Sequence, residues 1–337
     1  MEIITLNQNN FNQYSFEDFF NDYPFERYYF KQLGLSHAET IEFLIHNLHK
    51  RTHRSDGIEN QVWLVLDKGT IQGIFGVAKN TLHSRVYESS IFEIGPIYNF
   101  KQDTDAVFAA FNNQLRAFAK NYTEIYFKCK LDSSDHKNIA HLNKAGFDYY
   151  ATGQKVLYTH EESGEKFEEY YAQHGAPKEE HFAIKQFDKE RDDFELLNTL
   201  IDQHEKSEHF YNYNDHFDFK KTNELFKEWF SMYIGNPRTQ VFQLIDTQQE
   251  KVIGFTSFNG PVDIAGKKVY TRDLTIIEQS YRGLGLATLL YKAIVDETQT
   301  FIEGSPMVDN YQNLKLNMKC GYSIVQSRAY FKQFFKN

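Results

Sequence analysis

The chain has 337 residues, about twice a common domain length, which predicts two domains. With 41% hydrophobic and 16% aromatic residues and only 6 prolines and 18 glycines, the composition excludes disordered and collagen-like proteins. A net charge of -9 without a long Lys/Arg run argues against nucleic acid as the main partner.

Three features of the chain bear on where it works. Its two cysteines, Cys129 and Cys320, are too few for a disulfide framework. The first residues have neither a basic nor an apolar segment of the kind found in signal peptides, and no run of 18 apolar residues occurs. We therefore expect a cytoplasmic protein with no membrane span.

The first half predicts strands and helices in alternation. A hairpin is expected over 61–66 and 71–78, followed by a strand over 91–97, a helix over 104–121 and a helix ending at Gly146-Phe147. The charged segment 159–181, with Gly164, Gly175 and Pro177, shows no sustained apolar period. It predicts a boundary, with domains over 1–160 and 181–337 and a linker over 161–180.

The second half repeats this order, with strands over 239–245, 251–258 and 269–277, a helix over 284–299 and a helix ending at Gly321-Tyr322. Gly146 and Gly321 are separated by nearly the same number of residues as Gly73 and Gly254, which favours a duplication. Strands mixed with helices in each half predict an α/β or α+β architecture.

Residues 282–287, Arg-Gly-Leu-Gly-Leu-Ala, connect the strand over 269–277 to the next helix. Free amides at a helix start, with glycines that allow close approach, favour a bound phosphate or diphosphate. A tight turn into a helix would explain the glycines equally well. The loop is neither a Walker loop nor a dinucleotide-binding GxGxxG motif.

The motif Arg282-x-x-Gly285-x-Ala287 resembles the CoA diphosphate loop of the GNAT superfamily of N-acetyltransferases, and Thr275-x-Ile277 before it resembles tandem-domain members. Asn310-x-x-Asn313-x-x-Leu316-Asn317 is similar to the family's last helix. The resemblance covers residues 252–325. It implies two tandem GNAT-like domains, each a mixed, mostly antiparallel twisted sheet flanked by helices.

The resemblance also implies acyl-CoA as co-substrate, acetyl-CoA or a larger one such as 3-hydroxybutyryl-CoA, and no metal. Its binding residues would be Ile276, Ile277, Arg282, Gly283, Leu284, Gly285, Leu286, Ala287, Thr288, Asn310, Asn313 and Asn317. The loop over 98–102 in the first half has no glycine. The first half is therefore expected to be a degenerate GNAT-like domain that builds the substrate cleft or a dimer face.

The implied reaction is direct transfer of the acyl group to a primary amine. Amides near Ile276 and Ile277 would stabilise the carbonyl oxygen, and Asp273 is the candidate base. Strand alternation predicts Asp273, Thr275 and Ile277 on one face and Arg272, Leu274 and Ile276 on the other. An ion pair with a neighbouring strand is an equal alternative for Asp273; Glu278 is the reserve base.

The candidate catalytic residues are thus Asp273, Ile277 and Asn317. Many family members carry a tyrosine, thought to protonate the leaving thiolate, where this chain has Asn317. Asparagine cannot act as that acid, so Asn317 is expected to orient CoA or the substrate. A CoA thiolate leaves with little help because its pKa is low.

The segment 208–230 resembles bacterial nucleotide-sugar amine acyltransferases of the dTDP-fucosamine acetyltransferase kind. The candidate substrate residues are His209, Tyr211, Phe217 and Arg272, with core packing as the alternative for the aromatic ones. Leu225 and Trp229 are expected in the core.

The leading hypothesis is an N-acyltransferase acting on a dTDP-linked amino sugar in polysaccharide biosynthesis. Alternatives are another small amine or a protein amine as acceptor, and a non-catalytic CoA-binding regulator. A tandem transferase using aminoacyl-tRNA is disfavoured by the intact CoA loop and the acidic charge. A small molecule is the expected partner; a homodimer is left open.

Overall fold

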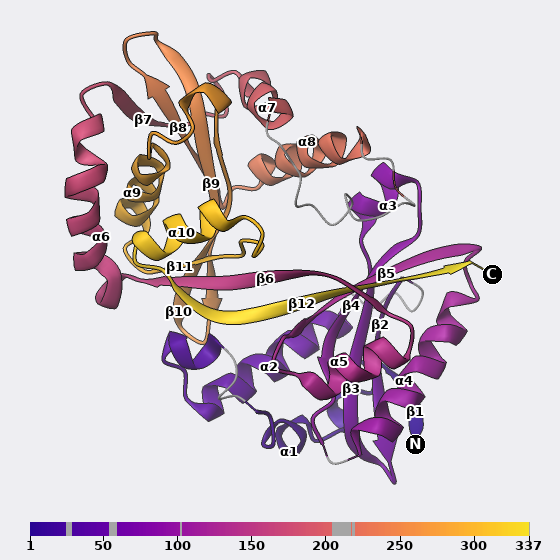
Figure 1. Cartoon of the computed structure of the whole chain (residues 1–337). Helices are drawn as coiled ribbons and strands as arrows, with labels where there is room; N and C mark the ends of the chain where they lie inside the picture. The colour runs from indigo at the N-terminus through magenta and orange to yellow at the C-terminus, as the bar shows by residue number, and fades with distance from the viewer. Residues whose placement is uncertain (25–28, 54–58, 102, 204–216, 218–219, 337) are drawn as a thin grey trace. The chain divides into compact units, whose positions relative to one another are not determined.

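The computed structural model describes residues 1–24, 29–53, 59–101, 103–203, 217 and 220–336. These residues form two compact units (Figure 1). The first, unit 1, comprises Met1–Gly153 and Gln326–Asn337; the second, unit 2, comprises Gln154–Val325. Within the described ranges, every helix falls short of the length and hydropathy that a membrane span needs.

Unit 1 contains a mixed sheet in the order β1-β2-β3-β4-β5-β12. Neighbouring strands are antiparallel apart from the pair β4 and β5. The strands are β1 (Glu2–Leu6), β2 (Asn60–Asp67), β3 (Thr70–Lys79), β4 (Ile91–Tyr98), β5 (Glu124–Asp132) and β12 (Ser323–Lys336). The predicted hairpin over 61–78 is confirmed as β2 and β3, which turn at Lys68 and Gly69, both with positive φ.

The helices of unit 1 are α1 (Phe16–Phe20), α2 (His37–Thr52), α3 (Thr81–Tyr87), α4 (Thr104–Ala119) and α5 (His136–Lys144), with 3-10 turns η1 (Phe11–Gln13) and η3 (Tyr29–Leu33). Helix α4 begins at its N-cap Asp103, whose side chain accepts from the Ala106 amide. Its apolar stripe packs on β2–β5, with Phe111 stacked on Phe75 of β3 at 4.1 Å between centroids.

The strands of unit 2 follow one another in the order β6-β11-β10-β9-β8-β7, and β10 and β11 are the parallel pair among them. Its strands are β6 (Asp148–Thr159), β7 (Phe182–Gln186), β8 (Thr239–Asp246), β9 (Lys251–Ile264), β10 (Lys267–Ile277) and β11 (Phe301–Gly304). Strand β6 enters this unit with its second part, and Val156–Thr159 pair with β11. Each unit thus has an antiparallel meander followed by one parallel crossover, which agrees with the predicted repeat of the same element order in a mostly antiparallel sheet.

Two apolar clusters cover the two faces of the unit 2 sheet. Helices α6 (His160–His174), α9 (Ala287–Thr298) and α10 (Tyr311–Lys319) contribute to one cluster, and α7 (Phe194–Gln203) and α8 (Lys220–Gly235) to the other. The short turns are η4 (Ala176–Lys178) and η6 (Gln279–Tyr281). We call these faces the α9 face and the α8 face.

The segment 161–180, expected as a linker, is mostly helix α6 and part of unit 2. Phe167 and Tyr171, one turn apart, are buried against the α9 face. Tyr170 and Ala176 pack against the same cluster while partly exposed, and the rest of the segment is mostly polar, so the sequence showed no sustained helical period. The unit boundary lies at Gly153 and Gln154, and residues from Gln326 onward return to unit 1.

Candidate active site at the end of strand β10

A β-bulge interrupts strand β10 at the predicted catalytic segment. Arg272 pairs with Phe258 of β9 and Thr275 with Thr256, so Asp273 and Leu274 together stand opposite one residue. The expected alternation is therefore wrong at this point. Asp273 lies with Leu274 and Ile276 on the α8 face, while Arg272 and Ile277 lie on the α9 face.

Arg272 is buried in the α9 face with 4% of its surface exposed. Its guanidinium lies over the ring of Tyr291 at 4.3 Å from the centroid and 5.7 Å from that of Tyr322. Its Nη2 donates to Asn317 Oδ1 at 2.6 Å. A Cβ on Gly304 would lie 3.0 Å from Nη2, so this glycine makes room for the guanidinium. The predicted substrate residue Arg272 thus has its contacts within the protein.

Three asparagines, all predicted at the cofactor site, organise helix α10. Asn310 is the N-cap and accepts from the Asn313 amide at 3.1 Å. Asn313 Oδ1 accepts from the Tyr291 hydroxyl at 3.0 Å and from Asn317 Nδ2 at 2.8 Å. Asn317 is fully buried, with its oxygen bonded to Arg272 and its amide to Asn313. It has the geometry of a residue that positions β10 against α10.

Asp273 receives a hydrogen bond from the hydroxyl of Tyr233 on α8. The side chain is exposed on one side, yet protein surrounds the carboxylate on the other. This partial burial, together with the negative charge of Glu303, raises the pKa of Asp273 from 3.8 to about 7. No ion pair of Asp273 occurs among the described residues, and its alternative role as a strand-to-strand ion pair is not what the structure has.

Glu303 is the second carboxylate of this region, and no local pattern around it predicted a role. It lies on β11 opposite Thr271 of β10, whose hydroxyl donates to Glu303 Oε1 at 3.2 Å. Its other oxygen is 2.6 Å from Nζ of Lys155, a buried lysine on β6. The ion pair holds this carboxylate in place on β11.

The loop from Glu278 to Leu286 joins β10 to α9 as predicted. Gly283 and Gly285 have φ of +81° and +74°, so both need glycine's freedom. A Cβ on Gly283 would meet no atom within 4 Å, so the backbone at this glycine is open to a ligand. The side chain of Leu284 is 52% exposed, whereas Leu286 and Thr288 are buried and anchor the start of α9, where Ala287 is the first residue.

The open backbone at Gly283, the helix start and Arg282 suit the diphosphate of a CoA molecule, which needs donors and positive charge without side chains in the way. Arg282 Nε donates to the Ile277 carbonyl at 3.0 Å, which ties the loop to the strand end. The Thr288 amide donates to the Gly285 carbonyl at 3.2 Å, so this amide stabilises the turn itself. The predicted loop residues thus come together in one place.

Ile277 ends β10 on an open strand edge. The Glu278 amide donates to the Ile253 carbonyl of β9. Because successive amides of a strand point in opposite directions, the Ile277 amide points away from β9. Among the described residues, the parallel ladder of β10 with β11 covers Val269–Thr271 and does not reach Ile277. The Ile277 amide is therefore the better donor for a ligand carbonyl, because Ile276 pairs toward Phe255 of β9.

The structure describes only some of the residues predicted to bind the amine substrate. His209 and Tyr211 lie outside the described residues, and Phe217 is half-buried. Leu225 is buried, and Trp229 packs against the α8-face cluster, as the core alternative predicted. In the described part of the chain, no group of three or more potential ligands suits a metal ion.

In unit 1, packed side chains follow β4 at the position that corresponds to the glycine loop after β10 of unit 2. After β4, Asn99 is buried and its amide donates to Asn138 of α5 at 2.8 Å. Phe100 packs on Phe19 at 4.7 Å, and Lys101 pairs with Asp22. Side chains therefore take the space that glycines leave open in the loop after β10.

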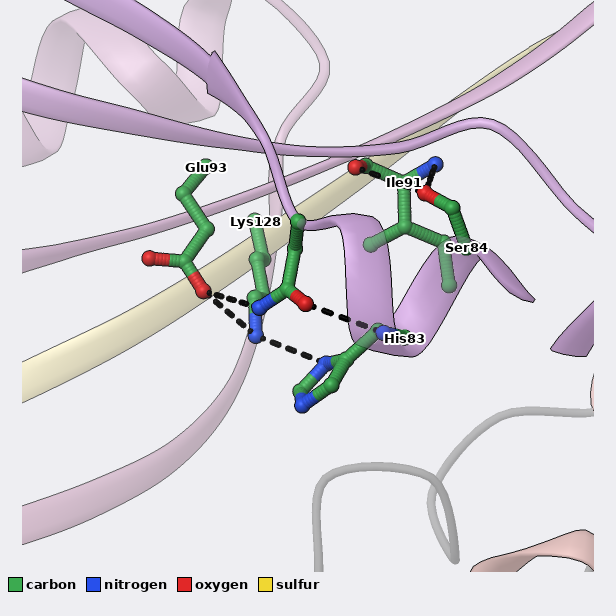
Figure 2. A network of polar contacts seen from close by, with 6 residues as sticks. His83, Ser84, Ile91, Glu93 and Lys128 are labelled. Carbon is green, nitrogen blue, oxygen red and sulfur yellow. Dashed lines mark hydrogen bonds and ion pairs between the residues drawn. The ribbon is translucent and has the colours of Figure 1, made fainter. Parts of the chain in front are cut away.

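A polar network on β4 and β5 of unit 1 was also missed by sequence reasoning. Figure 2 shows Lys128 between Glu93 and His83, at 2.9 Å from Glu93 Oε1 and 3.1 Å from His83 Nδ1. Burial raises the pKa of Glu93, but Lys128 outweighs it and holds the pKa at about 2. Glu93 and Lys128 are register partners in the parallel ladder, a pairing that no local pattern reveals.

No family model and no curated protein matches the sequence. Solved structures do share the fold. A GCN5-related N-acetyltransferase from Sphaerobacter thermophilus aligns with a TM-score of 0.63 and 9% identity over 99% of this chain and 96% of that one. A tandem GNAT protein from the clavulanic acid biosynthesis pathway aligns with a TM-score of 0.52 and 10% identity, over 99% of this chain and 98% of that one.

A third structure is the GCN5-related glucosamine N-acetyltransferase region of a fungal multi-domain GH3 beta-N-acetylglucosaminidase. It aligns at 0.57 and 10% identity, over 98% of this chain and 38% of that chain. At such identities the likeness concerns the fold alone. The chain thus has the tandem GNAT fold that the sequence predicted.

Proposed function

We propose that this protein is an acyl-CoA-dependent N-acyltransferase whose active site lies in unit 2. The observation that carries the proposal is the loop after β10, where two glycines have positive φ directly before the start of α9 and the backbone at Gly283 is open. The tandem GNAT fold supports it, because this loop occurs where the family resemblance expects the CoA diphosphate.

The cofactor would be held by Arg282 and by the backbone of Gly283, Leu284, Gly285 and Leu286. Bound acyl-CoA supplies a thioester carbonyl that an amine can attack. The Ile277 amide, on the open edge of β10, would donate to the carbonyl oxygen as negative charge develops there. The three asparagines of α10 would act indirectly, because they hold this helix against Arg272 of β10; they are Asn310, Asn313 and Asn317.

Asp273 would accept the proton of the attacking amine, directly or through water. The new bond joins the amine nitrogen to the acyl carbon, the carbon–sulfur bond breaks, and CoA leaves as the thiolate. A base with a pKa of about 7 is half deprotonated at neutral pH, which suits proton transfer in both directions. Tyr233 and Glu303 would set its orientation and charge.

For the acceptor we propose the amino group of a sugar, in particular a dTDP-linked amino-deoxy sugar. The fold is compatible with amino-sugar chemistry, since a glucosamine N-acetyltransferase region shares it. The resemblance of the segment 208–230 is what favours the nucleotide. Another small amine or a protein amine is the alternative acceptor, and a regulator that binds CoA without turnover is the alternative function.

Thermal protection separates these functions, because a ligand that binds only the folded state raises Tm. We expect both acetyl-CoA and dTDP-amino sugars to raise Tm, each alone, and the mixture to form an N-acyl sugar. Protection by CoA alone would exclude the nucleotide sugar, and no response to CoA would exclude the transferase. Arg282→Ala should raise KM for acyl-CoA more than KM for the amine; equal effects would indicate a folding role.

A further inference from the structure

We propose that Lys178, from the turn after helix α6, is a ligand of the CoA diphosphate in unit 2. The inference rests on the proposed function and adds a residue outside the loop motif. A Cβ on Gly285 would lie 3.6 Å from Lys178 Nζ and 3.7 Å from its Cε, so the lysine covers the second loop glycine. The cation thus lies beside the second glycine of the loop, two residues after the open backbone position at Gly283.

The turn that carries Lys178 is built to hold it there. A Cβ on Gly175 would lie 2.4 Å from the ring of Tyr171, so only glycine lets the chain pass over this buried ring. The Gly175 amide donates to the Tyr171 carbonyl at 2.7 Å, and the Lys178 amide to the Gly175 carbonyl at 2.8 Å. Pro177 stiffens the turn between them.

Neighbouring charges do not neutralise Lys178. The carboxylate of the next residue, Glu179, accepts a hydrogen bond from the Tyr171 hydroxyl at 2.5 Å. Two other lysines of unit 2 have carboxylate partners: Lys251 of β9 lies 2.6 Å from Glu278, and Lys292 of α9 lies 3.2 Å from Glu168. Across the ranges that the structure describes, no ion pair includes Lys178.

An ammonium group without a carboxylate partner, next to a glycine of the loop that precedes helix α9, is suited to a phosphate group. Lysine binds phosphate as a point charge, so its contribution depends on position more than on orientation. Because Lys178 faces Gly285 of the loop, we assign it to the diphosphate and not to the 3′-phosphate of CoA.

The test is calorimetric binding of CoA and of 3′-dephospho-CoA to the full chain, without any amine acceptor. Lys178→Gln should weaken both ligands by the same factor, about tenfold or more for one charge-assisted contact. Lys178→Arg should retain most of the affinity. The matched control is Lys166→Gln on the exposed side of α6, which should bind like the parent chain.

The outcomes are distinguishable. If the parent chain binds neither ligand, the proposed function fails. If it binds both and Lys178→Gln binds them equally well, only the Lys178 assignment fails. A loss confined to CoA would also overturn it, because the lysine would then serve the 3′-phosphate. Unchanged Tm values without ligand show that the variants are folded.

Discussion

The hydroxyl of Tyr233 on α8 donates a hydrogen bond to the carboxylate of Asp273 on β10. The bulge in β10 makes this contact because it turns Asp273 to the α8 face, away from Arg272. Partial burial and Glu303 raise the pKa of this carboxylate to about 7. Its protonation therefore changes within the range in which enzymes work.

The pH dependence of the transferase should follow Asp273. A proton acceptor works only when deprotonated, so kcat/KM should rise with pH and level off above a midpoint near 7. The hydrogen bond from Tyr233 favours the charged form of the Asp273 carboxylate. Tyr233→Phe removes this bond and should therefore move the midpoint to higher pH. Asp273→Asn should lower kcat/KM by about a hundredfold or more. The exposed Tyr311→Phe is the control and should leave the midpoint unchanged.

Glu303→Gln should move the same midpoint in the opposite direction. The negative charge of Glu303 raises the pKa of Asp273, so its removal should shift the pH profile to lower pH. The change also leaves buried Lys155 without its carboxylate partner, and Tm is measured to confirm folding. A midpoint that stays in place in a folded variant would contradict the role given to Glu303.

The contact between Arg272 and Asn317 should be measurable in a double-mutant cycle of unfolding free energies. Arg272→Met leaves the buried Asn317 oxygen without its Arg272 donor, and Asn317→Leu leaves Nη2 of the guanidinium without the Asn317 acceptor. Each change should destabilise the protein by about 2 kcal/mol or more. The double variant should cost less than their sum by at least about 0.5 kcal/mol. Strict additivity would show that the two residues do not stabilise each other.

Gly283→Ala separates backbone strain from ligand binding. The alanine must adopt a φ of +81°, which costs about 1 kcal/mol of stability. Gly266→Ala, in the β9–β10 turn with φ of +80° and equally open surroundings, is a matched control with the same strain. We expect similar losses of stability, but weaker acetyl-CoA binding only for Gly283→Ala. Equal binding by both variants would argue against a ligand at Gly283.

In unit 1, Glu93→Gln should lower the unfolding free energy by up to about 1 kcal/mol at neutral pH, because the pair with Lys128 is partly exposed. The folded carboxylate has a pKa of about 2, below its ordinary 4.5. Its stabilisation is therefore present above pH 4.5 and lost as pH falls toward 2. The difference between variant and parent, followed by denaturant titration, should shrink over that interval. Glu124→Gln, at the exposed pair with Lys336, is the control.

Local patterns predicted the parts of the fold that local physics determines. The hairpin β2–β3 follows from its turn, and the loop after β10 from its two glycines. The bulge at Asp273 did not follow, because register depends on the partner strand β9. Nor did Glu303 and Lys178, which approach the site from distant segments. The order of elements was predictable; the faces of the residues around the bulge were not.

The pairing of the last strand has a consequence for synthesis on the ribosome. Strand β12 supplies Arg328–Lys336 as the partner of β5, while Val156–Thr159 of β6 complete the sheet beside β11. The edge of β5 therefore stays uncovered until Arg328–Lys336 have been translated. An exposed edge strand invites wrong pairing, so nascent chains of this protein should depend on chaperones longer than two independent domains would.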